Sequence, residues 1–286
     1  PKTKEAINVD ADGDGGVVAW LDDDAGAVMK VSTQIPGIKV QAAKDSRYMF
    51  YNRNKLQKIN LKMLDTQDVR NMERMFQGCS DLKSLDLTPL NTQNVTSMAN
   101  MFSSCVSLTS LDLTPLNTQN VTNMANMFSS CVSLTSLDLA SLDTQEVTDM
   151  RGMFSSCYRL TSLDLTLLDT QNVTNMSGMF QYCSGLTSLD LSSLNTQNVT
   201  SMSYIFYDCS CLTNLDLTHL DTSKVTSMYF LFYDCSALTS LTTGTTFKFV
   251  GIDYSLPGTW QNTAGETFTT GTFPSNVADT YTKVSS

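Results

Sequence analysis

The sequence repeats itself every 26 residues, and this period limits the fold more than any other feature. Two columns of residues define the repeat. The leucine column is Leu85, Leu111, Leu137, Leu163, Leu189, Leu215 and Leu241. The cysteine column is Cys79, Cys105, Cys131, Cys157, Cys183, Cys209 and Cys235. A fixed period of this length predicts a solenoid, in which each unit buries its apolar face only against its neighbours.

The unit that contains Leu108, Leu111 and Leu113 shows how one repeat is built. This LxxLxL spacing is typical of the strand of a leucine-rich repeat. Downstream, four apolar residues fall at i, i+3, i+7 and i+10 and predict a short helix that Asn120 caps. They are Val121, Met124, Phe128 and Cys131. We therefore predict an α/β repeat solenoid, a right-handed leucine-rich-repeat coil with one short strand and one short helix per turn.

The two ends of the chain lack the repeat. We predict an N-terminal β-hairpin cap over 1–45, a solenoid of about eight 26-residue units over 46–241 and a C-terminal β-rich cap over 242–286. The apolar runs Val17–Leu21 and Ala27–Val31 are the expected strands of the hairpin. The C-terminal cap is expected to cover the last coil and to shield its open edge.

Charge is distributed unevenly along the chain and limits the class of partner. The formal net charge is -10, and most of the 18 lysines and arginines precede residue 84. A nucleic-acid partner requires a basic stripe that neutralises phosphates, and the long middle of the chain has none. Apolar runs are too short to span a bilayer. We therefore expect no nucleic-acid partner and no membrane insertion by this fragment.

The residues that the best-kept copies share define the pattern of the unit. In one copy they are Leu85-Asp86-Leu87, Leu90-Asn91-Thr92, Val95-Thr96, Met98, Met101-Phe102 and Cys105. Over about 46–241 this pattern closely resembles the BspA-like leucine-rich-repeat surface proteins of bacteria. Two departures are Arg53, where cysteine is expected, and Leu116, where a standard leucine-rich repeat has asparagine.

The resemblance implies a function outside the cell. It implies an adhesin-like, non-enzymatic protein on the bacterial cell surface, which binds a host or neighbouring-cell protein or glycan. It does not imply one particular ligand. The secretion signal and the anchor of such a protein are not visible in this sequence.

Few residues are candidates for catalysis or metal binding. His219 is the only histidine and occupies a variable turn position, without the placed partners that a catalytic base needs. One cysteine per coil forms a column, whereas zinc needs about four converging ligands. Parallel side chains in neighbouring coils also oppose disulfide bonds. We predict no catalytic residues, buried free thiols along the column and an exposed thiol at Cys211.

Calcium is the one cofactor that a motif suggests. Asp10, Asp12 and Asp14, followed by Gly15, match the first half of a calcium-binding loop, where alternate carboxylates converge on the cation. The twelfth position, which should be glutamate, is Leu21. The loop is either a weak calcium site or a solvated acidic loop.

A column of aspartates follows the leucines along the predicted strands. Its members are Asp86, Asp112, Asp138, Asp164, Asp190 and Asp216. Either they form a solvated ladder with threonine and serine hydroxyls, or they form an acidic stripe that binds a basic partner or cations. Mutual repulsion is expected to raise their pKa values, so that stability increases as the pH falls.

Aromatic residues gather in the late coils at positions that hold small residues earlier. The late residues are Tyr182, Tyr204, Tyr207, Asp208, Tyr229, Phe230, Tyr233 and Asp234. Their early equivalents are expected to be exposed and include Ala99, Asn100, Ser103 and Ala125. The aromatic residues either form an exposed patch that binds protein or glycan, or they pack beneath the C-terminal cap.

These observations leave two main functional hypotheses. The first is a surface binding protein that presents a rigid repeat face. The second is a structural spacer or stalk that holds another domain away from the cell, which the near identity of 91–116 and 117–142 favours. Ice binding through threonine ladders is disfavoured by the adjacent aspartates. An enzyme comes last, because no acid, base and nucleophile are grouped.

Overall fold

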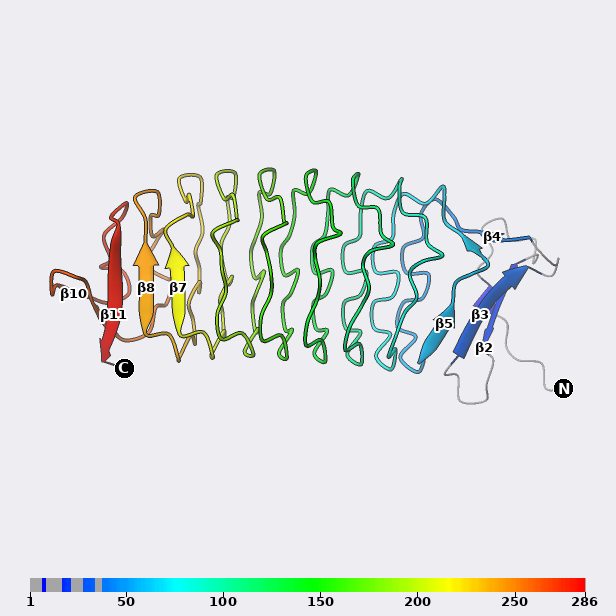
Figure 1. The fold of residues 1–286 in the computed structure, drawn as a ribbon, viewed down its shortest axis with the longest axis horizontal. Coiled ribbons are helices and arrows are strands. Elements are labelled where there is room, and N and C mark those ends of the chain that lie inside the picture. Colours follow the sequence, from blue (N-terminus) through cyan, green and yellow to red (C-terminus); the bar gives the residue numbers. More distant parts are fainter. Residues whose placement is uncertain (1–6, 9–16, 22–27, 34–37, 286) are drawn as a thin grey trace.

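The chain forms a rod of stacked coils with a small β-sheet at each end (Figure 1). The structure is a computed structural model and describes residues 7–8, 17–21, 28–33 and 38–285. Each coil lies directly against the next, so residues 26 positions apart become neighbours. The two ends are closed in different ways.

The N-terminal sheet has the strand order β1-β2-β3-β5, and β2 pairs with β3 in an antiparallel manner. A separate parallel pair, β4 with β6, joins the segment before the first Met-Phe unit to the coil that follows. The strands are β1 (Ile7–Asn8), β2 (Val17–Leu21), β3 (Val28–Thr33), β4 (Val40–Gln41), β5 (Lys58–Asn60) and β6 (Leu64–Asp65). Strands β2 and β3 fall on the apolar runs that predict a hairpin.

The C-terminal sheet has the order β10-β9-β11-β8-β7. Strands β7 and β8 are the LxxLxL segments of the last two coils and pair in parallel, whereas β11 adds to β8 in an antiparallel manner. The strands are β7 (Asn214–Leu217), β8 (Ser240–Thr243), β9 (Thr259–Gln261), β10 (Thr267–Phe268) and β11 (Asp279–Ser285). The antiparallel strand therefore occupies the edge to which a further coil would add.

Apolar columns run through the rod and form one continuous core. Leucine, methionine, phenylalanine and cysteine from every full unit are buried. The phenylalanine rings stack from coil to coil, at centroid distances from 5.3 Å between Phe50 and Phe76 to 6.3 Å between Phe180 and Phe206. Identical side chains thus pack on copies of themselves, which is why the period has to be so regular.

The predicted helix in each coil is wrong, because the described residues contain no helix. Residues 124–131 form successive turns, in which the Met127 amide donates to the Met124 carbonyl at 3.2 Å. Other amides of the segment donate hydrogen bonds to the next coil. The Met124 amide donates to the Asp149 carbonyl at 3.0 Å, and the Asn126 amide donates to the Arg151 carbonyl at 2.8 Å. In an α-helix the Asn126 and Met127 amides would instead donate to carbonyls four residues back in the same segment. The apolar spacing is therefore that of a turn run, which buries Met127 as well as Phe128.

Left-handed backbone at two fixed positions per coil produces this turn run. The first position is Tyr48, Arg74, Asn100, Asn126, Gly152, Gly178, Tyr204 and Phe230. The second is Asn52, Gly78, Ser104, Ser130, Ser156, Tyr182, Asp208 and Asp234. A positive φ interrupts a right-handed helix and favours glycine or asparagine. At Gly152, a Cβ would also press on the Asn126 amide oxygen of the previous coil.

Polar side chains bind neighbouring coils instead of capping helices. Asn120 caps no helix, since its side-chain amide donates to the Gln93 carbonyl of the previous coil at 2.7 Å. The buried Thr92 hydroxyl donates to the Asn117 carbonyl at 2.8 Å and accepts from the Asn117 amide at 2.8 Å. Equivalent threonines are buried in every coil from Thr66 to Thr222. This threonine column satisfies backbone groups that would otherwise be buried without partners.

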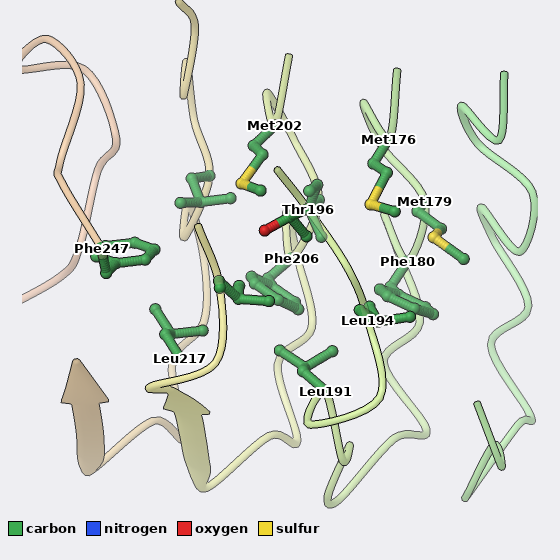
Figure 2. A pocket seen from close by; sticks show the side chains of 13 residues that line it. Met176, Met179, Phe180, Leu191, Leu194, Thr196, Met202, Phe206, Leu217 and Phe247 are labelled. Atoms are coloured by element: carbon green, nitrogen blue, oxygen red, sulfur yellow. The ribbon is translucent and has the colours of Figure 1, made fainter. Parts of the chain in front are cut away.

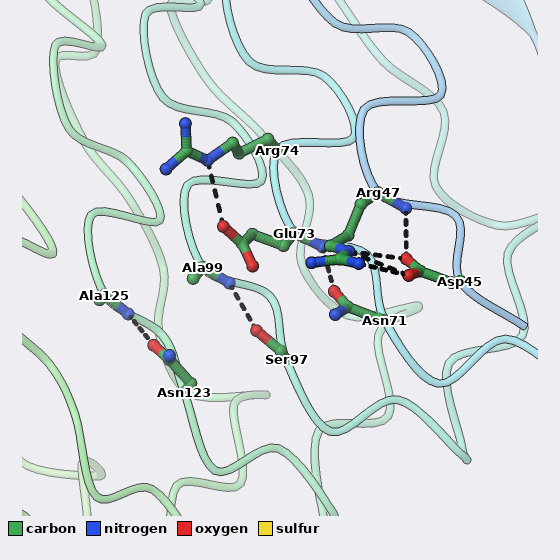
Figure 3. Close-up of polar contacts among 9 residues, drawn as sticks. All are labelled: Asp45, Arg47, Asn71, Glu73, Arg74, Ser97, Ala99, Asn123 and Ala125. Atoms are coloured by element: carbon green, nitrogen blue, oxygen red, sulfur yellow. Dashed lines mark hydrogen bonds and ion pairs between the residues drawn. The ribbon is translucent and has the colours of Figure 1, made fainter.

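One regular strand per turn is also not what the described coils show. In the middle of the rod the LxxLxL leucines are buried, but few backbone hydrogen bonds join this segment to the next coil. One of them runs from the Thr135 amide to the Thr109 carbonyl at 3.4 Å. Parallel pairing instead runs through one position per coil, which follows the Val-Thr pair in the regular units and extends from Asp45 through Asn71 to Ser227. There the side chain also accepts from the amide two residues on, as Asn123 does from Ala125 at 2.9 Å (Figure 3).

A small cavity interrupts the core in the late coils. Its volume is about 20 Å³, and Met179 and Phe180 lie in its lining (Figure 2). Ile205 and Leu231 also line it. The methionine column changes to Ile205 and Leu231 at this place. Because these side chains are shorter than methionine, they leave a void roughly one water molecule in size. The cavity is apolar and closed to ligands of any useful size.

We predict that Phe154→Ala lowers the free energy of unfolding by about 3–5 kcal/mol, because it removes a buried ring from the centre of the stack. Urea denaturation followed by circular dichroism measures the change. Leu167→Ala is the matched control, since Leu167 is 62% exposed, and it should change the free energy by less than about 0.5 kcal/mol. Equal losses in both variants would contradict a core built on the phenylalanine stack.

Candidate functional site

The run of turns in each coil forms one long side of the rod, which we call the turn ridge. It comprises the four outward columns that contain Arg47, Tyr48, Tyr51 and Asn52 in the first unit. Inter-coil hydrogen bonds hold the ridge backbone, so equivalent side chains lie beside one another. Along the ridge, aromatic residues occupy both ends and small residues the middle.

At the C-terminal end of the ridge, six rings form a single contact network, here called the aromatic cluster. Tyr207 lies at its centre and stacks on Tyr233 at 4.8 Å, with an interplanar angle of 14°. Tyr182 meets Tyr207 edge-on at 5.1 Å. The members are Tyr182, Tyr204, Tyr207, Tyr229, Phe230 and Tyr233. Solenoid stacking thus brings together residues that are up to 51 positions apart in the sequence.

The aromatic cluster stays accessible to solvent beside the C-terminal cap. Tyr229 is 42% and Tyr233 44% exposed, whereas the other four residues are half-buried. The segment after the last coil continues the ladder, since Phe230 donates to the Asp253 carbonyl at 2.7 Å and Phe232 to Tyr254 at 2.9 Å. This segment takes the place of a further coil without covering the outer rings. The C-terminal cap extends the continuous core of the rod with buried residues that include Trp260 and Tyr281.

Three members of the aromatic cluster occupy strained backbone positions. Tyr182, Tyr204 and Phe230 have φ between 53° and 62°, in the two left-handed columns. Gly152 and Gly178 occupy one of these columns in the preceding coils at less cost. Bulky residues at positive φ typically cost about 1–3 kcal/mol each. Contacts among the rings offset part of this cost, at about 0.5–1.5 kcal/mol per pair.

Two carboxylates flank the aromatic cluster. Asp208 and Asp234 follow Tyr182 in the second left-handed column. Partial burial raises the pKa of the Asp208 carboxyl, the negative charge of Asp234 raises it further, and a hydrogen bond with Ser210 opposes the rise. This end of the ridge therefore carries negative charge that is only partly solvated.

A groove continues from the aromatic cluster, between the last coil and the C-terminal cap. Its volume is about 630 Å³. The lining is Tyr233, Asp234, Ser236, Ser255, Leu256, Pro257, Thr270 and Lys283. The sequence analysis missed this groove, because one of its walls lies outside the repeat, where no period indicates which residues meet.

The middle of the ridge is smoother than expected. Of the small residues predicted to be exposed, Ala99, Ser103 and Ala125 are buried. That prediction is wrong because neighbouring coils approach closely enough to cover side chains of this size. The middle coils therefore expose mainly small polar side chains on the ridge, and they offer a partner few large side chains to pack against.

The N-terminal end of the ridge carries its own aromatic pair. Tyr48 and Tyr51 meet edge-on at 5.3 Å, and the Arg74 guanidinium lies 5.6 Å from the Tyr48 ring centre. Arg74 also contacts Glu73 at 3.1 Å, and Arg47 contacts Asp45 at 2.7 Å (Figure 3). At this end the chain supplies both cations and anions itself.

The aspartate column lies outside the turn ridge, in solvent. Each carboxylate accepts a hydrogen bond from the backbone amide two residues on, such as Asp112 from Thr114 at 2.9 Å. The Thr114 hydroxyl adds a bond to Asp112 at 2.7 Å. The column residues are exposed at all six positions, including Asp112, Asp138, Asp164 and Asp190. Bonds within each coil thus orient the carboxylates.

The prediction of raised aspartate pKa values is wrong for four column members. Hydrogen bonds from the Thr88 and Thr114 hydroxyls, and then from their amides, lower the pKa values of Asp86 and Asp112. The amides of Thr166 and Ser192 are the main cause for Asp164 and Asp190. Repulsion between coils is the smallest contribution at Asp164. In water, direct hydrogen bonds to the charged form outweigh repulsion between solvated charges.

The column cysteines are buried and free, and Cys211 is exposed. Each thiol donates to a phenylalanine carbonyl of the previous coil, as Cys131 does to Phe102 at 3.2 Å. Burial raises the pKa of Cys79 to about 11 and that of Cys131 to about 12. These thiols lack the thiolate character of reactive cysteines.

The remaining candidates bring no further site together. His219 is exposed on the surface of its coil. Within residues 38–285 and the three described N-terminal strands, no three histidine, cysteine, aspartate or glutamate side chains are grouped to hold a metal ion. Asp10, Asp12 and Asp14 lie outside the described residues, so a calcium site there stays a prediction. The described part also contains no helix long and apolar enough to cross a membrane.

With this geometry established, the repeat can be assigned to a family. A family model described as a Mycoplasma protein of unknown function, DUF285, matches residues 44–163 and 132–244, which together exceed half of the chain. The chain belongs to the DUF285 family. The matched residues carry the same 26-residue pattern that resembles the BspA-like leucine-rich-repeat proteins. No curated protein matches the chain.

Bacterial leucine-rich-repeat proteins are among the solved structures similar to this DUF285 protein. One from T. pallidum is 20% identical over 66% of this chain and 85% of its own, with a TM-score of 0.40. One from Bacteroides ovatus is 18% identical over 84% of this chain and 70% of its own, also with a TM-score of 0.40. A leucine rich cell surface protein from Faecalibacterium prausnitzii is 16% identical over 84% and 94%, with a TM-score of 0.24.

The lowered aspartate pKa values predict acid sensitivity. A carboxyl with a depressed folded pKa contributes stability that is present above its ordinary value of 3.8 and is lost as the pH falls through the folded value. We expect a nearly constant melting temperature from about pH 7 to pH 5 and a decrease below about pH 4. Converting Asp86, Asp112, Asp164 and Asp190 to asparagine should reduce this decrease. Asp45, Asp221 and Asp279, whose pKa values are also lowered, should preserve part of it. A melting temperature that rises below pH 5 would contradict the assignment.

The cysteine burial predicts selective labelling. A thiol reagent applied briefly to the reduced native protein should modify about one thiol per chain, at Cys211, because only this thiol is exposed. All eight should react after denaturation. Mass spectrometry locates the label, and Cys211→Ser is the control that should abolish native labelling. Rapid modification of the column cysteines would show that the coils open readily.

Proposed function

We propose that this DUF285 protein is a non-enzymatic, adhesin-like binding protein, displayed outside the bacterial cell, that binds a protein on a host or neighbouring cell. The observation that carries this proposal is the aromatic cluster. Six contacting rings stand beside two carboxylates at one end of a rigid ridge. Tyrosine provides a large, rigid contact area with a polar group, which is the composition of interface hot spots.

The form of the rod supports recognition rather than catalysis. The column thiols are buried, and burial raises the pKa values of Cys79 and Cys131. The core cavity of about 20 Å³ is too small for a substrate. The two conspicuous surfaces, the ridge and the aspartate column, are both static arrays fixed by hydrogen bonds between and within coils.

A spacer role is the second candidate, and the middle coils favour it. Their ridge positions are small and their sequences nearly identical, as expected of units that serve only to add length. The same rod can do both, with the middle coils as a stalk and the last coils as the contact surface. The aromatic cluster distinguishes the two hypotheses, since a pure spacer does not require it.

The triple variant Tyr204→Ser, Tyr207→Ser and Tyr233→Ser tests the proposed function. We expect affinity for immobilised extracellular-matrix or host-surface proteins to fall by more than about tenfold, measured by surface plasmon resonance. The melting temperature should fall by no more than about 3 °C, because the rings lie outside the core. Tyr48→Ser with Tyr51→Ser is the matched control at the other end of the ridge and should leave binding unchanged.

Two outcomes would contradict the proposal. Unchanged binding in the triple variant would remove the aromatic cluster from the interface and favour the spacer. A large loss of stability would instead show that the rings complete the core beside the C-terminal cap. Retained protein binding together with lost binding to a glycan array would assign the aromatic cluster to a glycan.

A further inference from the structure

The two ends of the turn ridge carry related arrangements that differ in one component. At the N-terminal end, Tyr48 is contacted by the Arg74 guanidinium at 5.6 Å, and Glu73 contacts that guanidinium at 3.1 Å. Ring, cation and carboxylate are therefore all supplied by the chain. This arrangement combines a cation–π contact with a charge-assisted hydrogen bond.

The C-terminal end has the ring and the carboxylate but lacks the cation. Tyr233 is 44% exposed, and Asp234 follows it directly in the same coil. Asp208 lies next to Asp234 in the column, where each feels the charge of the other. Within residues 38–285, no arginine or lysine forms an ion pair with either carboxylate. Lys224, which belongs to the same coil as Asp234, donates a hydrogen bond from its ammonium group to the Asn198 side chain instead.

The adjoining groove limits what can bring the missing cation. Tyr233 and Asp234 line one wall, whereas the half-buried Pro257 provides apolar surface on the other, with Leu256 buried beneath it. Lys283 also lines the groove and repels a second positive charge that lies close to it. A volume of about 630 Å³ accommodates a few extended residues. The groove thus suits a single cationic side chain beside Tyr233 and Asp234, with an apolar side chain against Pro257.

We propose that this end of the ridge binds an arginine of the partner protein, with its guanidinium on the exposed face of Tyr233 and its charge paired with Asp234 and Asp208. The residue next to the arginine places an apolar side chain against Pro257. This inference rests on the proposed function and gives the partner its chemistry: an exposed, extended segment with one arginine followed by an apolar residue.

Arginine fits better than lysine for a geometric reason. A guanidinium is planar, so it stacks on a ring while its edge donates two hydrogen bonds to carboxylates. An ammonium group is strongly hydrated and makes no comparable stacking contact. The overall charge of -10 also attracts cationic segments and repels acidic ones.

Three synthetic peptides provide the test with the intact chain. The probe is acetyl-Gly-Arg-Leu-Gly-amide, and its counterparts carry lysine or the uncharged isostere citrulline in place of arginine. Titrations followed by NMR are run at low salt and at about 0.5 M salt, where charge contacts are screened. We expect arginine to bind about 3- to 10-fold tighter than lysine, the citrulline peptide to show no saturation, and added salt to weaken binding.

Variants identify the contact. Asp234→Asn keeps a residue that tolerates positive φ, so it removes charge without new backbone strain. This variant and Tyr233→Ser should each weaken the arginine peptide at least about 5-fold. Asp138→Asn, in the aspartate column, and Tyr158→Ser, an exposed tyrosine off the ridge, are the matched controls and should bind as the unaltered chain does.

The outcomes separate this inference from the proposed function. Equal binding of the arginine and citrulline peptides, or full affinity in Asp234→Asn, overturns the inference whether or not the tyrosine triple variant loses its surface partner. Specific arginine binding that Asp234→Asn abolishes supports the inference. If the triple variant nevertheless keeps its surface partners, the proposed function fails alone.

Discussion

The hydrogen bonds that leave each coil for the next are the interaction on which the structure depends. Alternate amides of the turn run, such as Met124, Asn126 and Phe128, donate to carbonyls one coil ahead, while the amides between them close turns. A coil on its own would leave half of these groups without partners. Each coil therefore requires a neighbour for its polar backbone as well as for its apolar face, and an antiparallel strand ends the series.

This ladder also explains why function concentrates on the turn ridge. Because the backbone is held at every second residue, a substitution in an outward column alters the surface and leaves the path of the chain unchanged. Small residues in the middle coils and aromatic residues in the last ones are thus variations on one scaffold. The left-handed positions illustrate this. Tyr204 and Phe230 occupy the same column as Gly152 and Gly178, although glycine adopts a positive φ at less cost.

Charge separates the two ends of the ridge. Arg47 and Arg74 pair with acids of the N-terminal coils, whereas Asp208 and Asp234 face solvent beside uncovered rings. The aspartate column has a different character, because each of its carboxylates already receives a hydrogen bond from its own coil. A partner protein gains more binding energy at the aromatic cluster, because the exposed rings and the partly buried Asp208 carboxylate have no cation from the described part of this chain paired with them.

The sequence by itself determined the period, the buried leucine, phenylalanine and cysteine columns, and the gathering of Tyr204, Tyr207 and Tyr233, because stacking at a fixed period makes equivalent residues neighbours. It did not reveal the turn run, since Val121, Met124 and Phe128 have helical spacing; the asparagines and glycines at 100, 126, 152 and 178 were the available signal. Only the tertiary structure decided the direction of the aspartate pKa shifts, which depends on hydrogen-bond geometry. It alone also decided the groove beside Tyr233, because Leu256 and Lys283 reach it through a non-repeating chain path that no periodicity predicts.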